Sequence, residues 1–154
     1  RRAVQRFKRE IKLVAQLDHP NIVRAHDAGE SESRFYLVME YIKGSDVACI
    51  LRENPRVEPK PAIRLAIQVL NALAHAHSKG MVHRDIKPAN VLLAELGGAA
   101  RQVKLTDFGL ARVYRASQLS GLTMSGDLGG TPAYMPPEQI TNYRQVMPAA
   151  DQYS

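Results

Sequence analysis

A predicted hairpin between Asn90 and Asp107 constrains the fold more than any other part of this sequence. Two short apolar runs, 91–94 and 103–106, read as strands on either side of a Gly97-Gly98 turn. Asn90 stands just before the first run and Asp107 just after the second. Pairing of the two strands is therefore expected to bring these two polar side chains together at one end of the hairpin.

The eight residues that end at Asn90, His-Arg-Asp-Ile-Lys-Pro-Ala-Asn, carry groups suited to phosphoryl transfer. The carboxylate of Asp85 can orient an attacking hydroxyl and accept its proton. Lys87 can neutralise phosphoryl charge, and the amide oxygen of Asn90 can ligate Mg²⁺. Asp107 offers a second oxygen ligand for the metal, and Gly109 permits a sharp turn beside it. The pattern predicts a site that handles the terminal phosphate of a nucleotide.

These motifs, in this order, closely resemble the signature set of the protein kinases. The octet matches His-Arg-Asp-x-Lys-Pro-x-Asn, and Asp107-Phe108-Gly109 matches Asp-Phe-Gly. Pro136-Pro137-Glu138 stands where the set has Ala-Pro-Glu. A solvated turn with a local ion pair would explain an isolated His-Arg-Asp, but three motifs in order favour the family. The Lys-Pro-Ala-Asn and Pro-Glu-Gln segments look most like bacterial Ser/Thr kinases of the eukaryotic type.

The resemblance implies an α+β fold, the partial two-lobed fold of a protein kinase. Residues 1–42 would form a remnant of the N-lobe with the hinge strand, and residues 43–154 would form the first part of the C-lobe. ATP and Mg²⁺ are implied as cofactors, and a protein Ser or Thr hydroxyl as the acceptor. In this interpretation Asp85, Lys87 and Asn90 are catalytic, and Lys87 also contacts ATP. The metal ligands are Asn90 and Asp107.

A helix is predicted from Val4 to Leu17, where apolar residues recur every three or four positions until His19-Pro20 stops the pattern. Glu10 lies near the edge of its buried face, where an unpaired carboxylate would be costly. In the kinases that this chain resembles, the matching Glu pairs with a lysine that holds the α- and β-phosphates. The alternative is an exposed pair with Arg6, four residues earlier.

The sequence begins at Arg1 without the glycine-rich loop or the lysine-bearing strand that precede this helix in the family. Two interpretations therefore stay open. The chain is an internal segment of an active Ser/Thr kinase, or it is a truncated, non-catalytic kinase-like module that is unable to hold ATP. For the 154 residues alone, the second interpretation is favoured.

Further secondary structure is predicted from periodicity and turn residues. Aromatic and β-branched residues predict strands over 21–27 and 35–42, with a polar turn at 29–33 between them. After a proline-rich interruption, the apolar spacing from Ile63 to His77 predicts a helix that ends at Gly80.

The resemblance also implies where the nucleotide base lies. The second predicted strand would run into the hinge, with Met39 as the gatekeeper beside adenine and the backbone of Glu40 to Ile42 bonded to it. Leu92 would pack beneath the base, although an apolar strand residue is expected there in any case. Asp46 would either contact ribose or cap the helix that follows, and both readings stay open.

Further positions match structural parts of a kinase. His83 and Phe108 resemble members of a stack that includes Val14, so His83 is expected to pack and to bond backbone rather than to transfer protons. Asp151 resembles the Asp that holds the backbone of the octet. Glu138 would anchor the substrate-binding loop through an Arg in a later helix.

Residues 107–138 resemble an activation segment. Either Thr123 or Ser125 is predicted to be an autophosphorylation site, and Arg84 matches the cation that such kinases use to capture a phosphate. Thr131 resembles the threonine that bonds to the catalytic Asp and Lys and favours Ser or Thr acceptors.

Composition narrows the alternatives. The formal net charge is +6, but no base-reading motif or aromatic stacking array accompanies it, so nucleic acid is not a predicted partner. Cys49 is the one cysteine, which rules out an intrachain disulfide framework and fits a reducing compartment. No apolar run approaches the length of a membrane span. We therefore expect a cytoplasmic segment, and a parent protein anchored by other segments would be compatible with it.

Overall fold

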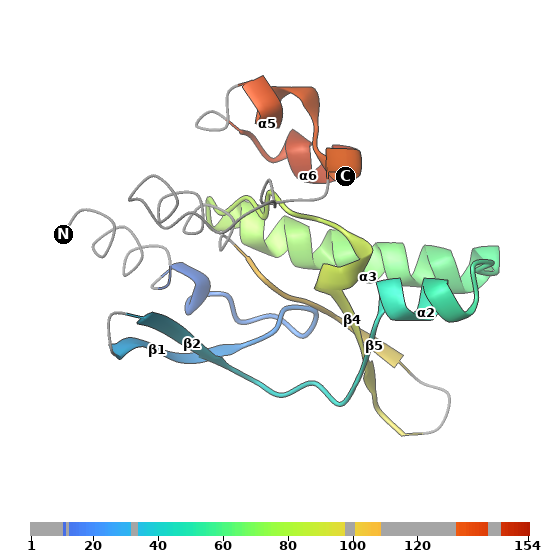
Figure 1. Cartoon of the computed structure of the whole chain (residues 1–154), viewed down its shortest axis with the longest axis horizontal. Coiled ribbons are helices and arrows are strands. Elements are labelled where there is room, and N and C mark those ends of the chain that lie inside the picture. Colours follow the sequence, from blue (N-terminus) through green and yellow to red (C-terminus); the bar gives the residue numbers. More distant parts are fainter. Residues whose placement is uncertain (1–10, 12, 32–33, 98–100, 109–131, 142–145) are drawn as a thin grey trace.

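The computed structural model describes residues 11, 13–31, 34–97, 101–108, 132–141 and 146–154 (Figure 1). Its strands form two antiparallel sheets, one of two strands and one of three. The strands are β1 (Ala25–Ser31), β2 (Arg34–Met39), β3 (Gly44–Asp46), β4 (Val91–Glu95) and β5 (Arg101–Leu105). The helices are α2 (Val47–Glu53), α3 (Pro59–Ser78), α5 (Pro137–Thr141) and α6 (Ala149–Tyr153), with 3-10 turns η1 (Pro88–Asn90) and η2 (Pro132–Tyr134). The predicted α+β class is confirmed.

The hairpin of β4 and β5 is present as the sequence predicts. The register pairs Val91 with Leu105 at one end and Glu95 with Arg101 at the other. The first strand runs one residue longer than predicted, and the second begins two residues earlier and ends one residue earlier.

The sheet of β1 and β2 departs from its predicted bounds. The strands were expected over 21–27 and 35–42, but β1 begins at Ala25 and continues through part of the predicted turn to Ser31. The cause is that the backbone of residues 21–23 forms hydrogen bonds with the end of β5 instead of with β2. The N–H of Val23 donates to the carbonyl of Leu105 at 2.9 Å, and the N–H of Leu105 donates to the carbonyl of Asn21 at 2.8 Å. These residues therefore extend the other sheet with an isolated parallel bridge.

Strand β3 was not predicted, because residues 44–46 read as a corner after the hinge. The strand pairs with β4, with Gly44 opposite Ala94 and Asp46 opposite Leu92. A Cβ atom at Gly44 would overlap the carbonyl of Leu93, so only glycine fits this close approach of two backbones.

Helix α3 confirms the helix that the apolar spacing predicts, but it starts four residues before Ile63. Pro59 and Pro61 lie in its first turn, where a missing N–H costs nothing. The proline-rich stretch is therefore partly the start of the helix. Gly80 adopts a φ of 73° directly after it, as a helix-ending glycine does.

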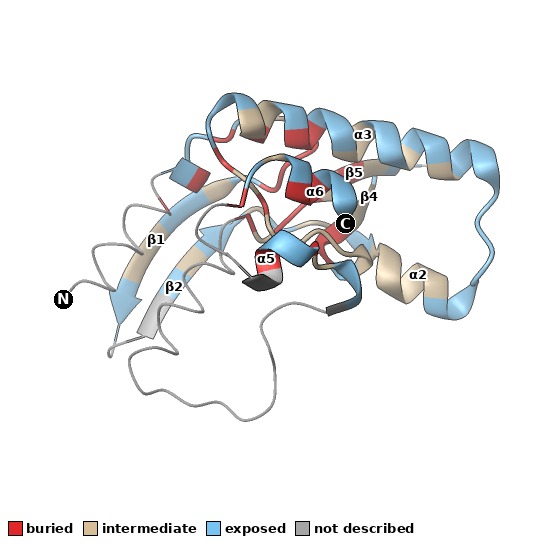
Figure 2. Ribbon diagram, turned by 90° about the horizontal axis from the view of Figure 1, so that it is seen from above, coloured by how far each residue is buried: buried red, intermediate tan, exposed pale blue. Residues whose placement is uncertain are grey.

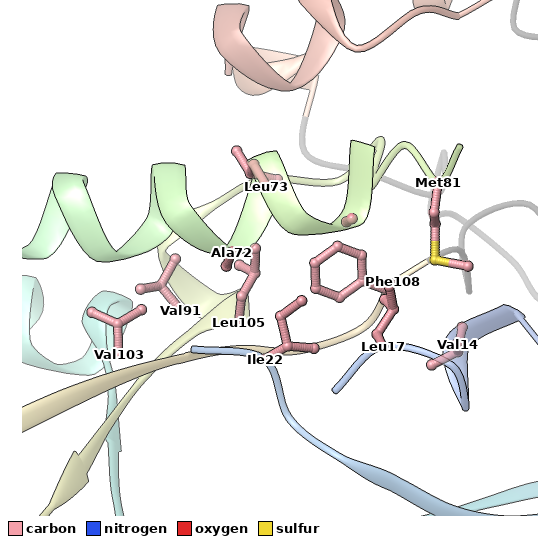
Figure 3. Packing of buried hydrophobic residues seen from close by; sticks show 11 residues of the cluster. Val14, Leu17, Ile22, Ala72, Leu73, Met81, Val91, Val103, Leu105 and Phe108 are labelled. Atoms are coloured by element: carbon pink, nitrogen blue, oxygen red, sulfur yellow. The ribbon is translucent and has the colours of Figure 1, made fainter. Parts of the chain in front are cut away.

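The core lies between α3 and the hairpin of β4 and β5 (Figures 2 and 3). Segment 14–22 closes it from the opposite side, so residues far apart in the sequence share one apolar cluster. Its buried members are Val14, Leu17, Ile22, Ala72, Leu73, Ala76, Met81, Val91, Val103, Leu105 and Phe108. This packing fixes the hairpin that carries Asn90 and Asp107.

Part of the helix predicted over residues 4–17 lies outside the described residues, namely 1–10 and 12. Ile11, Leu13 and Val14 are helical. Among the described residues, no helix has both the length and the apolar character that a membrane span requires.

Candidate active site

The hairpin brings the backbones of Asn90 and Asp107 to the same end of the sheet. Val91 pairs with Leu105, and the N–H of Thr106 donates to the carbonyl of Asn90 at 3.0 Å. Asn90 is buried in the turn η1, and Asp107 is half-buried two residues after β5. The sequence predicted this convergence, and the register explains it.

Asp85 is the centre of a short polar cluster. The ammonium Nζ of Lys87 lies 2.9 Å from Oδ2 of Asp85. The side-chain Nδ2 of Asn90 donates to the same Oδ2 at 3.1 Å and to the backbone carbonyl of Asp85 at 2.7 Å. Both contacts to the carboxylate use Oδ2, so within the described residues Oδ1 is left for another donor.

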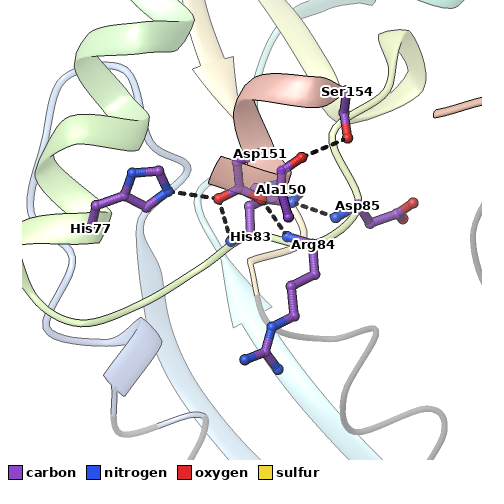
Figure 4. A network of polar contacts seen from close by, with 7 residues as sticks. All are labelled: His77, His83, Arg84, Asp85, Ala150, Asp151 and Ser154. Carbon is purple, nitrogen blue, oxygen red and sulfur yellow. Dashed lines mark hydrogen bonds and ion pairs between the residues drawn. The ribbon is translucent and has the colours of Figure 1, made fainter. Parts of the chain in front are cut away.

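The loop that carries Asp85 is held by a buried carboxylate from α6 (Figure 4). Asp151 accepts the N–H of His83 at 2.8 Å and the N–H of Arg84 at 2.7 Å. Its Oδ2 also lies 2.7 Å from Nε2 of His77, on α3. The side chain of Asp151 is fully buried, so these bonds form away from water, where they are strongest.

Two non-glycine residues in the site adopt left-handed backbone angles. Arg84 has a φ of 69° and Asp107 a φ of 65°. Each such residue costs roughly 1–3 kcal/mol, and the surrounding structure must hold it in place. At Arg84 the holding groups are Asp151 and the side-chain amide of Gln139, which donates to the carbonyl of Arg84 at 2.7 Å. The strain is therefore localised beside Asp85 and at the proposed metal ligand.

His83 is completely buried and serves packing. Its Nε2 bonds to the carbonyl of Thr106 at 2.8 Å, so this nitrogen carries the hydrogen. Its ring lies 4.5 Å from that of Phe108 at a tilt of 57°. Burial lowers the pKa of His83, and the negative charge of Asp151 opposes this only in part. A neutral imidazole that links the octet to residues 106–108 fits the packing role.

The hinge region contains an ion pair that the sequence interpretation missed. Oε1 of Glu40 lies 2.6 Å from Nζ of Lys104 and accepts the N–H of Arg24 at 2.8 Å. Burial alone would raise the pKa of Glu40, but these contacts outweigh it and lower the pKa. Lys104 alternates with Val103 and Leu105 in β5, so its position on the opposite face of the strand was the available signal.

The residues predicted to bind the base lie in different elements. Met39 ends β2, Ile42 lies in the connection between β2 and β3, and Leu92 lies in β4 opposite Asp46. Asp46 accepts the N–H of Cys49 at 2.8 Å, so it caps α2. A shared adenine pocket formed by these elements remains a prediction.

Several predicted regulatory residues lie outside the described part of the chain, namely Glu10, Thr123, Ser125 and Thr131. Glu138 is exposed on α5. Its neighbour Gln139 is buried and donates to the carbonyl of Arg84 in the octet, a contact that the sequence interpretation did not assign. Neither residue type nor spacing distinguishes this glutamine from a surface one.

The oxygen donors at the end of the hairpin suit Mg²⁺. Because Nδ2 of Asn90 donates to Asp85, the amide oxygen is the group left to bind a cation. The carboxylate of Asp107 is the second donor. Mg²⁺ commonly takes one or two protein oxygens together with water and substrate phosphates, so this donor set fits the ion.

Comparison with known proteins gives one consistent result. The protein kinase domain family matches residues 1–154. The serine/threonine-protein kinase PkaA of Streptomyces coelicolor is 44% identical over 150 residues, which cover 97% of this chain and 27% of PkaA. The serine/threonine-protein kinase PknA of Mycobacterium tuberculosis is 38% identical over 156 residues, covering 98% of this chain and 34% of PknA.

Solved structures agree. The kinase domain of PknI from Mycobacterium tuberculosis has a TM-score of 0.72 at 30% identity, and the match covers 99% of this chain and 53% of that one. A double mutant of the same domain gives a TM-score of 0.76. The chain therefore spans about half of the solved kinase domain and about a third or less of these curated relatives.

Proposed function

This chain belongs to the protein kinase domain family, and from that membership we propose that it carries the phosphoryl-transfer site of a serine/threonine kinase. The reaction would move the γ-phosphoryl group of ATP to a Ser or Thr hydroxyl of a protein. The observation that carries the proposal is the cluster of Asp85, Lys87 and Asn90 beside Asp107. A reaction that uses ATP would take place in the cytoplasm.

Asp85 would hold the acceptor. Its Oδ2 is fixed by Lys87 and Asn90, so Oδ1, which bonds to no other described residue, would accept the hydrogen of the substrate hydroxyl. The hydroxyl oxygen forms a bond to the γ-phosphorus while the bond from that phosphorus to the β–γ bridging oxygen breaks. The proton passes to Oδ1, and ADP leaves.

The other groups would hold charge and position. Nζ of Lys87, 2.9 Å from Asp85, lies where it can contact both the carboxylate and a γ-phosphoryl oxygen. Asn90 and Asp107 would hold Mg²⁺ by their side-chain oxygens. When bound, Mg²⁺ neutralises the charge that develops on the phosphates. Because the hairpin core fixes both ligands, little reorganisation is needed.

The test is phosphotransfer from ATP·Mg²⁺ to a Ser/Thr protein substrate, measured with the complete protein that carries this sequence. Asp85→Asn should lower the rate by about 10²- to 10⁴-fold, the usual contribution of a positioned general base. Asp27→Asn, a matched change at an exposed strand residue, should leave the rate unchanged. Equal rates for Asp85→Asn and the parent would refute the assignment.

A binding measurement distinguishes the active kinase from the alternative, a kinase-like module that does not bind ATP. Calorimetric titration with a non-hydrolysable ATP analogue and Mg²⁺ should give a saturable signal for the complete protein. The same titration on the 154-residue chain tests whether these residues alone bind the ATP analogue. Absence of binding by both proteins would favour the non-catalytic module.

A further inference from the structure

A cavity of about 490 Å³ lies between α2, α3 and the hairpin of β4 and β5. None of the residues assigned to the active site above lines it, so it is a separate site. The volume is in the range that small-molecule sites occupy. Its apolar lining comes from all these elements and includes Val47, Ile50, Leu51, Leu65, Leu93 and Val103.

Helix α2 explains why the cavity is there. Its residues at positions i, i+3 and i+4, Val47, Ile50 and Leu51, line the cavity, as an apolar helix face should line a core. Yet α2 has no buried residue, and these three side chains stay half-buried (Figure 2). An apolar occupant would complete the burial of this face, which is the main driving force for binding apolar groups.

Val103 lines the cavity, and its backbone N–H and carbonyl are both already hydrogen-bonded. The N–H of Val103 donates to Oε1 of Gln68 at 3.0 Å, and its carbonyl accepts from Nδ2 of Asn21 at 2.9 Å. Gln68 itself lines the cavity, but its carboxamide is engaged at both ends, since Nε2 donates to the carbonyl of Arg64 at 3.4 Å. A ligand therefore finds little to bond with here besides charged groups.

Two guanidinium groups supply that charge. Arg64 on α3 and Arg101 at the start of β5 both line the cavity and are exposed. Neither has an ion-pair partner within the part of the chain that the structure describes. Arginine binds carboxylates in a bidentate geometry that few other groups satisfy as well.

We propose that this cavity binds a small amphipathic carboxylate, with its hydrocarbon part against α2 and its carboxylate against Arg64 and Arg101. The apolar volume accepts the hydrocarbon, and the two guanidinium groups, which form no ion pair with any described residue, accept the anion. A peptide segment fits less well, because each residue would bring backbone N–H and carbonyl groups to a lining whose own polar groups at Val103 and Gln68 are already paired. The inference is independent of the phosphoryl-transfer reaction.

The experiment is calorimetric titration of the complete protein with decanoate at neutral pH. Decylammonium, which has the same chain length and the opposite charge, is titrated in parallel. Decanoate should bind saturably at one site, and decylammonium should bind at least about 10-fold more weakly, since a charge-assisted hydrogen bond contributes that much. Similar affinities for the two ligands would overturn the proposal.

Variants of the lining residues test whether decanoate binds in this cavity. Arg64→Gln and Arg101→Gln should each weaken decanoate binding by about 10-fold, and both are exposed, so folding should be preserved. Lys60→Gln, an exposed charge on the same helix outside the lining, should bind decanoate as the parent does. Ile50→Phe should abolish binding by filling the cavity without changing charge, and thermal melting reports whether it is folded. A double Arg64→Gln, Arg101→Gln variant with parental affinity would refute the site.

Titration with a peptide tests the other possible occupant of the cavity, a protein segment. A dodecapeptide that alternates leucine and glutamate carries the same apolar and acidic chemistry on a peptide backbone. The proposal expects it to leave decanoate binding unchanged. Binding of this peptide that Ile50→Phe abolishes, without binding of decanoate, would instead make the cavity a docking groove for a protein segment and overturn the proposal.

Discussion

At the scale of single residues, Asp151 has the largest predicted effect on stability. Its buried carboxylate accepts two backbone N–H groups of the octet and contacts His77. Asp151→Asn keeps the shape but turns one oxygen into an NH₂ group that faces a donor. Hydrogen bonds to a charged group contribute about 1.5–3 kcal/mol each, so the free energy of unfolding should fall by about 2–4 kcal/mol.

Urea denaturation of the complete protein measures this change, with Asp18→Asn as the matched control. Asp18 is exposed and its pair with Arg24, at 3.4 Å, lies in solvent, so the loss there should stay below about 0.5 kcal/mol. Equal losses for the two variants would show that Asp151 does not hold the loop.

Residue by residue, motif spacing predicted which side chains the site brings together, because Asp85, Lys87 and Asn90 are local in sequence. Among partners from distant segments, only Asp151 was expected at the octet, and that expectation came from the family resemblance, not from spacing. Two other distant contacts were not predicted. The contact between His77 and Asp151 joins positions 74 residues apart, and the pair of Glu40 and Lys104 joins positions 64 apart. Nothing in the identity of a histidine or a lysine specifies such a partner without the tertiary structure.

At the scale of elements, α2 depends on one cap. Asp46 accepts the N–H of Cys49 at 2.8 Å, and this bond lowers the pKa of Asp46. Asp46→Ala should lower the free energy of unfolding by about 1 kcal/mol, and Asp46→Ser should retain most of it, because serine also caps helices. The measurement is chemical denaturation of both variants. If Asp46 instead contacts ribose, Asp46→Ser would weaken nucleotide affinity while leaving stability intact.

The elements differ in how far the sequence predicted them. Helix α3 has a long periodic pattern, and the hairpin of β4 and β5 is marked by two apolar runs around a Gly-Gly turn; both were found with small errors at their ends. Strand β3 has three residues and exists only because Gly44 lets it approach β4. The bounds of β1 moved because residues 21–23 pair with β5. Tertiary pairing, which local pattern does not encode, accounts for both errors.

At the scale of the whole molecule, two histidines link folding to pH, the fully buried His83 and the half-buried His19. Burial is the main cause that lowers the pKa of His19 and of His83 from 6.5, and at His19 the neighbouring His75 and Lys104 lower it further. The unfolded chain therefore binds protons at these positions at a higher pH than the folded one. Stability is fully present above about pH 6.5 and is lost as the pH falls through that value.

The expected result is a free energy of unfolding that declines from pH 7.5 to pH 5, with a slope that approaches 1.4 kcal/mol per pH unit from the buried His83 and a smaller addition from the solvent-screened His19. Below about pH 4.5, Glu40 adds to the loss, because its folded pKa lies below that ordinary value. Urea denaturation across this range measures the slope. His19→Asn should reduce it, whereas His26→Asn, at an exposed position in β1, should leave it unchanged. A flat profile between pH 7.5 and pH 5 in the parent would mean that His83 becomes protonated without opening the core, which its complete burial against Phe108 argues against.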